Sequence, residues 1–197
     1  MALTKVRGAG AEGLTLSSTA LTVANGLTLT DGDIALASGH GLSFASNSNA
    51  SGMSTELLDD FEEGTFTPVL SSEGSNAISV GYAGTPGSQY TVGSYTKVGN
   101  TVHYQITVDV DSYSGGSSNN LLIGGLPFTS SSYITTSNGG GAVIYNSGHN
   151  TNPYTGIILG SQTNIRLYRS GSSTASQTQD FTANSYVQTV GSYKTDS

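Results

Sequence analysis

Five short segments near the N-terminus share one pattern, in which two apolar residues flank a single Thr, Ala or Ser. The segments begin at Leu14, Leu21, Leu27, Ile34 and Leu42, at intervals of 6 to 8 residues. Because side chains alternate between faces along a strand, both apolar residues of a segment face the same side. One chain alone has nothing to cover these faces. The pattern therefore predicts a β stalk over residues 14–44, formed by three chains wrapped about one axis.

The side chains expected to face this axis form the predicted trimer core. They are Leu14, Leu16, Leu21, Val23, Leu27, Leu29, Ile34, Leu36, Leu42 and Phe44. A coiled coil is excluded, because its apolar residues are three and four apart and each Gly in a helix costs about 1 kcal/mol. A single-chain β solenoid stays open, although five short coils would make a small core. His40 lies between two glycines, which favours a solvated turn over a metal ligand.

The composition excludes several classes of function. Only 10 % of the residues are charged and the net charge is −7, which argues against a nucleic-acid partner. Cysteine is absent, so neither disulfides nor thiolate metal sites can form. No apolar run approaches the length of a membrane span, and the first residues lack the apolar core of a signal peptide. We therefore expect a protein made in the cytoplasm that does not insert into membranes.

Residues 45–63 form a predicted joint between the stalk and a second domain. Residues 45–52 have the composition of a linker. Ser54 or Thr55 could cap a short helical turn that gathers Leu57, Leu58 and Phe61 on one side. The carboxylates that follow are Asp59, Asp60, Glu62 and Glu63. They could hold Ca²⁺, but they do not match the spacing of a calcium loop, so a solvated acidic turn is favoured.

Residues 64–197 read as an all-β head, with Gly64 marking the start of its first strand. The predicted strands are 65–70, 77–82, 93–97, 101–110, 120–123, 141–145, 156–159, 164–168 and 186–195. A two-residue turn at Gly99-Asn100 predicts a hairpin. Along Val102–Val110 apolar and polar residues alternate, so His103 and its polar companions face solvent or a neighbouring chain. Many short strands with frequent turns indicate a jelly-roll-like β-sandwich.

No arrangement of residues indicates catalysis. The three histidines, at positions 40, 103 and 149, are far apart and lie in no catalytic or metal-binding motif. Asp109 and Asp111 would share a face of a strand and could act as a pair or hold Ca²⁺, although exposed charges at a strand end are the simpler interpretation. We expect no enzymatic activity, no metal and no cofactor.

The acidic joint carries a resemblance to a known group of proteins. Residues 57–70, LLDDFEEGTFTPVL, resemble a joint found in structural proteins of tailed bacteriophages, where it links a thin repeat stalk to a C-terminal β head. Further similar pieces are GSYTKVGN at 93–100, LIGGLPFT at 122–129 and GSYKT at 191–195. The resemblance implies a homotrimeric tail fibre of the virion that attaches the phage to its host. The alternatives are a capsid-attached head fibre or decoration protein, and a polysaccharide-degrading tailspike.

The resemblance also implies how the ends of the molecule are used. Residues 1–13 would be an anchor peptide that docks onto other virion proteins, with Lys5, Val6 and Arg7 as its contact residues. The head would bind a glycan or protein on the host cell surface. Its longest polar loop with a tyrosine at each end is 145–154, so the predicted receptor-binding residues are His149, Asn150, Asn152 and Tyr154. The segment Arg169–Asp180 is the next candidate.

Overall fold

The computed structural model describes residues 33–37, 40–43, 57–58, 60–74, 78–84, 90–133, 136–149, 153–169 and 177–196. The chain divides into two units, Met1–Ala37 and Ser38–Ser197. In the first unit only 33–37 are described, and there Ile34 and Leu36 are exposed. The anchor peptide, the stalk segments before Ile34, Phe44 and the proposed caps at Ser54 and Thr55 lie outside the described residues. The trimeric stalk therefore stays a prediction.

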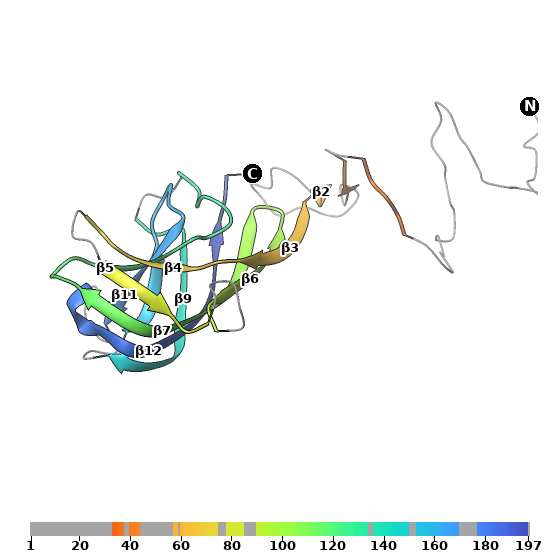
Figure 1. Ribbon diagram of the computed structural model, residues 1–197. Coiled ribbons are helices and arrows are strands. Elements are labelled where there is room, and N and C mark those ends of the chain that lie inside the picture. Colours follow the sequence, from red (N-terminus) through yellow and green to blue (C-terminus); the bar gives the residue numbers. More distant parts are fainter. Residues whose placement is uncertain are drawn as a thin grey trace, which may run out of the picture. The chain divides into compact units, whose positions relative to one another are not determined.

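The second unit is built from antiparallel strands, and the described residues contain no α-helix (Figure 1). A small two-stranded sheet joins β1 (Leu42–Ser43) and β2 (Leu57–Leu58). The other strands are β3 (Phe61–Phe66), β4 (Val69–Ser72), β5 (Ile78–Tyr82), β6 (Val92–Val98), β7 (Thr101–Gly115), β8 (Leu121–Gly124), β9 (Gly139–His149), β10 (Pro153–Ile158), β11 (Asn164–Arg169) and β12 (Phe181–Lys194), with one 3₁₀ turn at Thr178–Asp180. They form a single sheet in the order β3-β6-β7-β12-β9-β10-β11-β8-β4, and β5 also pairs with β7. The predicted all-β fold is confirmed.

Each predicted strand overlaps an observed one, but the first is broken in two. β3 ends at Phe66 and β4 begins at Val69, because Pro68 has no N–H to donate to a ladder. The two strands then pair at opposite ends of the sheet, β3 with β6 and β4 with β8. The predicted hairpin at Gly99-Asn100 is present between β6 and β7. Gly99 has a φ of 54° at the first turn position, as in a type II′ turn.

The sheet curls so that its two halves pack on each other. Alternate residues of β7 face inward, as the alternation predicted, and Val102, Ile106 and Val108 are fully buried. They pack in one cluster with residues of the facing strands, namely Leu70, Leu121, Ile123, Ile158, Ile165 and Leu167. The two layers expected of a sandwich thus belong to one continuous sheet.

A row of glycines accompanies the curl. Gly191, Gly141 and Gly156 are paired across β12, β9 and β10. A Cβ atom at Gly141 would lie 2.7 Å from the hydroxyl of Tyr104 and 2.0 Å from the carbonyl oxygen of Val190. The missing side chains make room for the Tyr104 ring on the inner face and allow the sheet to bend closely here.

The acidic joint is a strand rather than a helical turn, so this prediction was wrong. β3 begins at Phe61, three residues before Gly64, and pairs along its whole length with β6. The carboxylates find partners on β6: Asp60 forms an ion pair with Lys97, and Glu62 accepts a hydrogen bond from the hydroxyl of Tyr95. These contacts and the backbone ladder favour the extended conformation over a short isolated turn.

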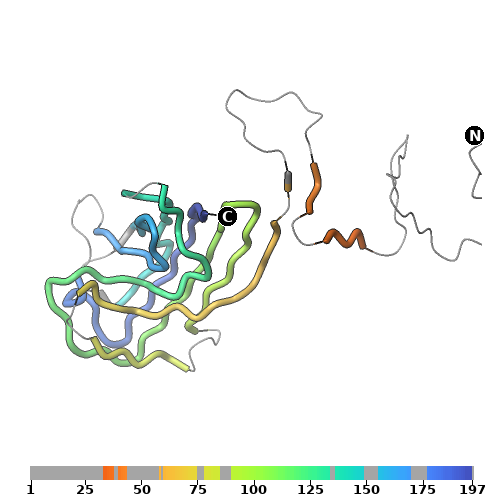
Figure 2. Tube along the Cα trace, turned by 90° about the horizontal axis from the view of Figure 1, so that it is seen from above, coloured from red at the N-terminus to blue at the C-terminus, as the bar shows by residue number. Residues whose placement is uncertain are grey.

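Both ends of the described head meet at the turn between β6 and β7. The backbone N–H of Gly99 donates to the carbonyl oxygen of Asp60 (2.8 Å), and the N–H of Thr195 donates to that of Asn100 (2.9 Å). Figures 1 and 2 show the C-terminus close to this turn. We call this the entry end. The end of β9 and the start of β12, where His149 pairs with Phe181, form the far end.

Candidate binding surface

The outer face of the sheet, formed by β3, β6, β7, β12 and β9, turns away from the core. On β7 it carries the polar residues that alternate with the buried ones. The strand register places the outward residues in rows across the sheet. One row is Glu63, Thr96, His103 and Ser192; the next is Thr65, Ser94, Gln105 and Val190. Two hollows lie on this face.

The entry-side hollow has a volume of about 620 Å³. It is lined by Glu63, Gly64, Thr65, Ser94, Tyr95, Thr96, His103, Tyr104, Gln105 and Val190. Nine of these ten residues form three trios of consecutive positions on the paired strands β3, β6 and β7, and the tenth is Val190 of β12. The middle member of each trio contributes its backbone to the floor, since the Tyr104 side chain is buried on the opposite face. Hydroxyl, amide, imidazole and carboxylate groups therefore stand around a backbone floor.

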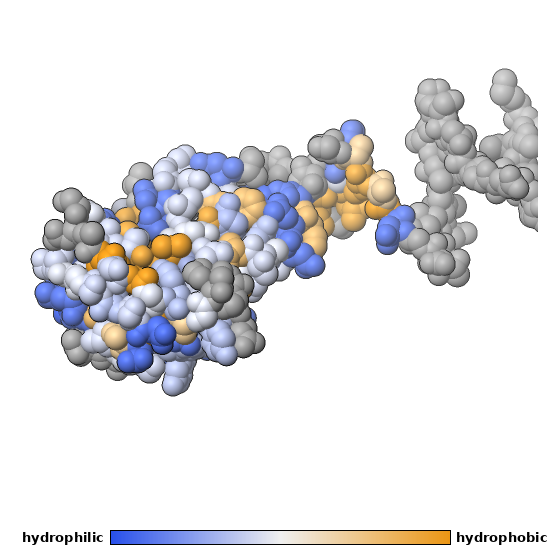
Figure 3. All heavy atoms as spheres, viewed as in Figure 1, coloured by the Kyte–Doolittle hydropathy of each residue, from blue (hydrophilic) through white to orange (hydrophobic). Residues whose placement is uncertain are grey.

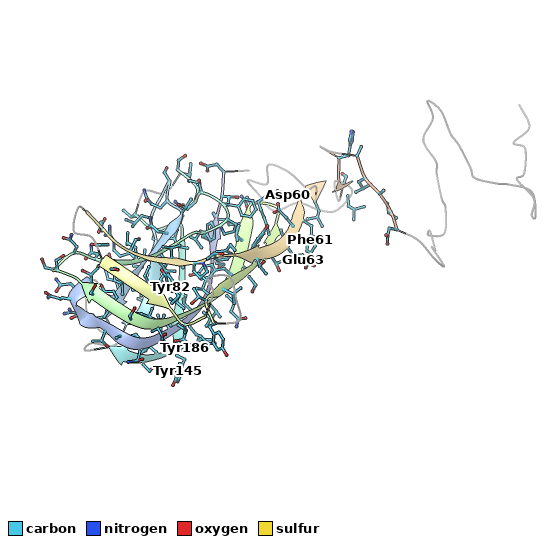
Figure 4. All side chains as sticks on the ribbon, viewed as in Figure 1. Asp60, Phe61, Glu63, Tyr82, Tyr145 and Tyr186 are labelled. Atoms are coloured by element: carbon cyan, nitrogen blue, oxygen red, sulfur yellow. The ribbon has the colours of Figure 1, made fainter. Side chains whose placement is uncertain are left out.

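The far-side hollow has a volume of about 560 Å³ and lies toward the far end. It is lined by Asp109, Val110, Asp111, Tyr145, Ser147, Asn184, Tyr186 and Gln188. The rings of Tyr145 and Tyr186 meet edge to face, with centroids 5.6 Å apart and planes at 70°. Figure 4 shows the two side chains next to each other, at β9 and β12. Tyr145 is 56 % exposed, so an aromatic surface is open to a ligand here.

A bulge in β12 shapes this hollow. The register between β12 and β9 shifts between Phe181 and Tyr186, and Asn184 within the bulge has a φ of 56°. The hydroxyl of Ser185 donates to the carbonyl oxygen of Gly148 at 2.6 Å and holds the bulge against β9. Bulges redirect side chains, and left-handed residues other than glycine are uncommon and gather at functional sites. This bulge brings Asn184 to the edge of the far-side hollow.

The two hollows follow one another along the same pair of strands. Gln105 pairs with Val190 in the entry-side hollow, and two residues further along β7 Thr107 pairs with Gln188 of the far-side hollow. The amide of Gln188 donates to the hydroxyl of Thr107 at 3.3 Å. At about 3.4 Å per residue, the part of β7 from His103 to Asp111 spans at most about 27 Å. The two hollows thus lie in line on one face of the sheet.

The chemistry of this surface suits a polyhydroxylated ligand. Amides, hydroxyls and carboxylates give hydrogen bonds of both polarities, and tyrosine gives a rigid plane with a polar tip. The lining residues include three carboxylates and no Lys or Arg. Among the described residues, no group of three His, Asp or Glu is placed to hold a metal ion. In the described part of the chain, no helix is long and apolar enough to cross a membrane.

Two of the four predicted receptor-binding residues lie in described strands. His149 is the last residue of β9, and Tyr154 lies in β10, so the predicted loop 145–154 is largely strand. Asn150 and Asn152 lie outside the described residues. Ser147, which lines the far-side hollow, precedes His149 by two positions on β9. The role of these four residues in binding stays a prediction.

Other predicted residues have clear places in the structure. Asp109 and Asp111 both line the far-side hollow, and His103 lines the entry-side one. Arg169 forms an ion pair with Asp180, so this alternative segment is tied into the fold at both ends. Sequence reasoning missed Tyr186 and Gln188. Their signal was the alternation within the predicted strand 186–195, which places them together on the outward face.

The inner face holds tyrosines whose hydroxyls are removed from water. Burial raises the pKa of Tyr193 to about 12 and raises that of Tyr104 still further. The Tyr193 hydroxyl donates to the carbonyl oxygen of Phe128 (3.0 Å) and accepts from its N–H (3.3 Å). The Tyr193 hydroxyl thus joins β12 to the segment around Phe128 on the inner face, and Tyr193 lines neither hollow.

Comparison with known proteins supports a relation to phage tails. No protein-family model and no curated protein matches the chain. Among solved structures, the chain is similar to the crystal structure of the Dettilon tailspike protein (gp208), with 25 % sequence identity and a TM-score of 0.52. The match covers 68 % of this chain and 24 % of the tailspike chain, so it corresponds to about a quarter of that protein. A phage tail-related protein with an all-β fold is the class that this similarity supports.

Proposed function

We propose that the protein is a non-enzymatic, homotrimeric tail fibre of a phage virion that attaches to glycans on the host cell surface. The observation that carries this proposal is the far-side hollow. It presents the exposed Tyr145 ring and a ring of hydrogen-bonding groups at the end of the head opposite the chain's entry. Weak contacts from three heads would add through avidity. The N-terminal residues Lys5, Val6 and Arg7 would hold the fibre to other virion proteins.

Exposed apolar side chains support the trimer. In the second unit, Leu42 is 50 % exposed and Phe61 is 64 % exposed, and Leu58 beside Leu42 is also exposed. Figure 3 shows hydrophobic residues in orange on the surface of the molecule. Three copies of the chain would cover them, as the triads of the stalk predict. The measurement is the mass of the folded protein in solution: a trimer is expected, and a folded monomer would contradict the proposal.

The adhesion proposal is tested with matched tyrosine variants. Tyr145→Ala removes the exposed ring of the far-side hollow, while Tyr133→Ala removes a ring that is 91 % exposed and lines neither hollow. Tyr145→Ala should lose most adsorption to host cells while keeping its fold and mass, and Tyr133→Ala should adsorb as wild type. Equal adsorption by both variants would refute the role of this hollow.

A polysaccharide-degrading tailspike is the rival function. It is favoured by the similarity to a tailspike and by Asp109 and Asp111, which line one hollow and could act as acid and base. Incubation with the polysaccharide of a host that the protein adsorbs to, followed by measurement of chain length, separates the two. The fibre proposal expects no shortening. Shortening that disappears in Asp109→Asn would establish the enzyme instead.

A further inference from the structure

We infer that the outer face binds one linear glycan lengthwise, along β7, with successive sugar units running from the far-side hollow to the entry-side hollow. The inference rests on the proposed attachment to glycans and adds the shape and charge of the receptor. It further assigns the receptor to glycans without anionic substituents.

The first argument is the alignment of the two hollows. Both are on one face of the same two strands, β7 and β12, and both continue along the strand direction. Between them, the floor is formed by Thr107, Gln188 and Val190 on adjacent positions of paired strands. Thr107 is only 9 % exposed, and its hydroxyl already accepts a hydrogen bond from Gln188. A polymer that runs from one hollow to the other would cross this pair of residues, Thr107 and Gln188.

The second argument is the length of the surface. The part of β7 from His103 to Asp111, which spans at most about 27 Å, exceeds what a single sugar ring can cover. A monosaccharide would use one hollow and leave the other without contact. A linear chain uses both, so each added unit over the floor brings further hydrogen bonds with Gln105 or Ser94.

The third argument is charge. Glu63 lies at one end of the surface, and Asp109 and Asp111 lie at the other. None of the lining residues is Lys or Arg. Lys97 on the neighbouring inner face is paired with Asp60, and Lys194, beyond the entry-side hollow on β12, donates to Asn100 and Thr101. Within the two hollows, phosphate, sulfate or carboxylate groups on the glycan would meet carboxylates without a lining cation, which raises the free energy of binding. Hydroxyls of an uncharged sugar instead donate to the same carboxylates.

The experiment uses the full-length protein and fragments of the surface polysaccharide from cells to which it adsorbs. The polysaccharide is hydrolysed, separated by length, and titrated against wild type, Tyr186→Ala, Gln105→Ala and the control Tyr133→Ala. Wild type should bind long fragments more tightly than short ones. Gln105→Ala should weaken binding of long fragments by about 5- to 10-fold, the value of about one hydrogen bond, and leave short fragments unaffected. Tyr186→Ala should weaken both.

The outcomes distinguish lengthwise binding from the proposed attachment to glycans on which it rests. Lengthwise binding is refuted if short and long fragments bind equally, or if Gln105→Ala weakens the binding of neither. If Tyr186→Ala abolishes binding in the same experiment, attachment through the far-side hollow stands. If Tyr186→Ala also binds all fragments as wild type does, both are refuted. Salt tests the charge assignment: affinity for an uncharged glycan should stay steady as salt rises. An affinity that increases or falls clearly, as screening of repulsion or of attraction gives, would overturn it.

Discussion

The ion pair between Asp60 and Lys97 joins the residue before β3 to β6. Removing one partner should lower the free energy of unfolding and so measure its contribution to stability. The Lys97 side chain is only 7 % exposed, whereas that of Asp60 is 38 % exposed. The ammonium also lies 5.5 Å from the centroid of the Phe128 ring. Asp60→Asn keeps the shape of the acid but leaves a buried cation without its counter-charge.

The magnitude follows from the burial of the two partners. Breaking a fully buried pair costs about 3–5 kcal/mol, and the partial exposure of Asp60 reduces this to about 2–3 kcal/mol because water can reach the vacated side. The urea midpoint of unfolding should then fall by about 1–2 M. Replacing both partners, as Asp60→Asn with Lys97→Met, should restore most of the loss, since the Met side chain keeps the packing against Phe128 without a charge.

Urea unfolding, followed by circular dichroism or tyrosine fluorescence, measures the effect. Glu63→Gln is the control, because it neutralises an exposed carboxylate on the same strand and should change stability by less than about 0.5 kcal/mol. The reasoning fails if Asp60→Asn unfolds at the wild-type midpoint. It also fails if the double variant is less stable than Asp60→Asn alone, since the uncompensated charge would then not be the cause.

Three further predictions concern the core, the pH dependence and the stalk. Ile106→Ala, at a fully buried site, should cost about 2–5 kcal/mol in chemical unfolding, and a cost below about 1 kcal/mol would contradict its place in the core. Burial raises the pKa of Tyr193 in the folded state to about 12 from 10.0, so the stability that its neutral form contributes is complete below pH 10 and is lost as the pH rises through 12. Tyr193→Phe should unfold more easily at neutral pH, because two hydrogen bonds are lost, yet show a shallower loss of stability between pH 10 and 12; an unchanged slope would refute this assignment. In the stalk, Leu27→Asp should lower the thermal midpoint far more than Thr28→Asp, because three carboxylates would be buried together, and equal midpoints would reject the inward orientation of Leu27.

Much of the head was predictable because its strands follow simple local rules. The alternation along Val102–Val110 predicted which side of β7 is buried, and Gly99-Asn100 predicted the hairpin. Both signals act over neighbouring residues and need no knowledge of distant partners. The prediction failed at the acidic joint, where local propensity favours a turn. The partners that make it a strand, Lys97 and Tyr95, are more than thirty residues away.

The binding surface was harder to predict for a related reason. The tyrosines at its two ends led to the prediction that 145–154 is a binding loop. Part of this segment instead belongs to β9, whose outward side chains lie next to those of β12 and β7. Tyr186 and Asp109 join Tyr145 only through the register of three strands and a bulge at Asn184. Register over such sequence distances is set by packing of the whole sheet, which no local pattern contains.

The meeting of both chain ends at the β6–β7 turn has a mechanical consequence. Any tension between the outer face and the residues that precede Asp60 enters the head through the first residue of β3. That strand runs from the entry end along β6, with six residue pairs from Phe61–Val98 to Phe66–Gly93. A pull along the strand loads these pairs together, in shear, instead of opening them one after another. The ion pair between Asp60 and Lys97 lies at the very start of this ladder and would bear the load first. Its Lys97 side chain is only 7 % exposed, so water has little access to that end of the pair.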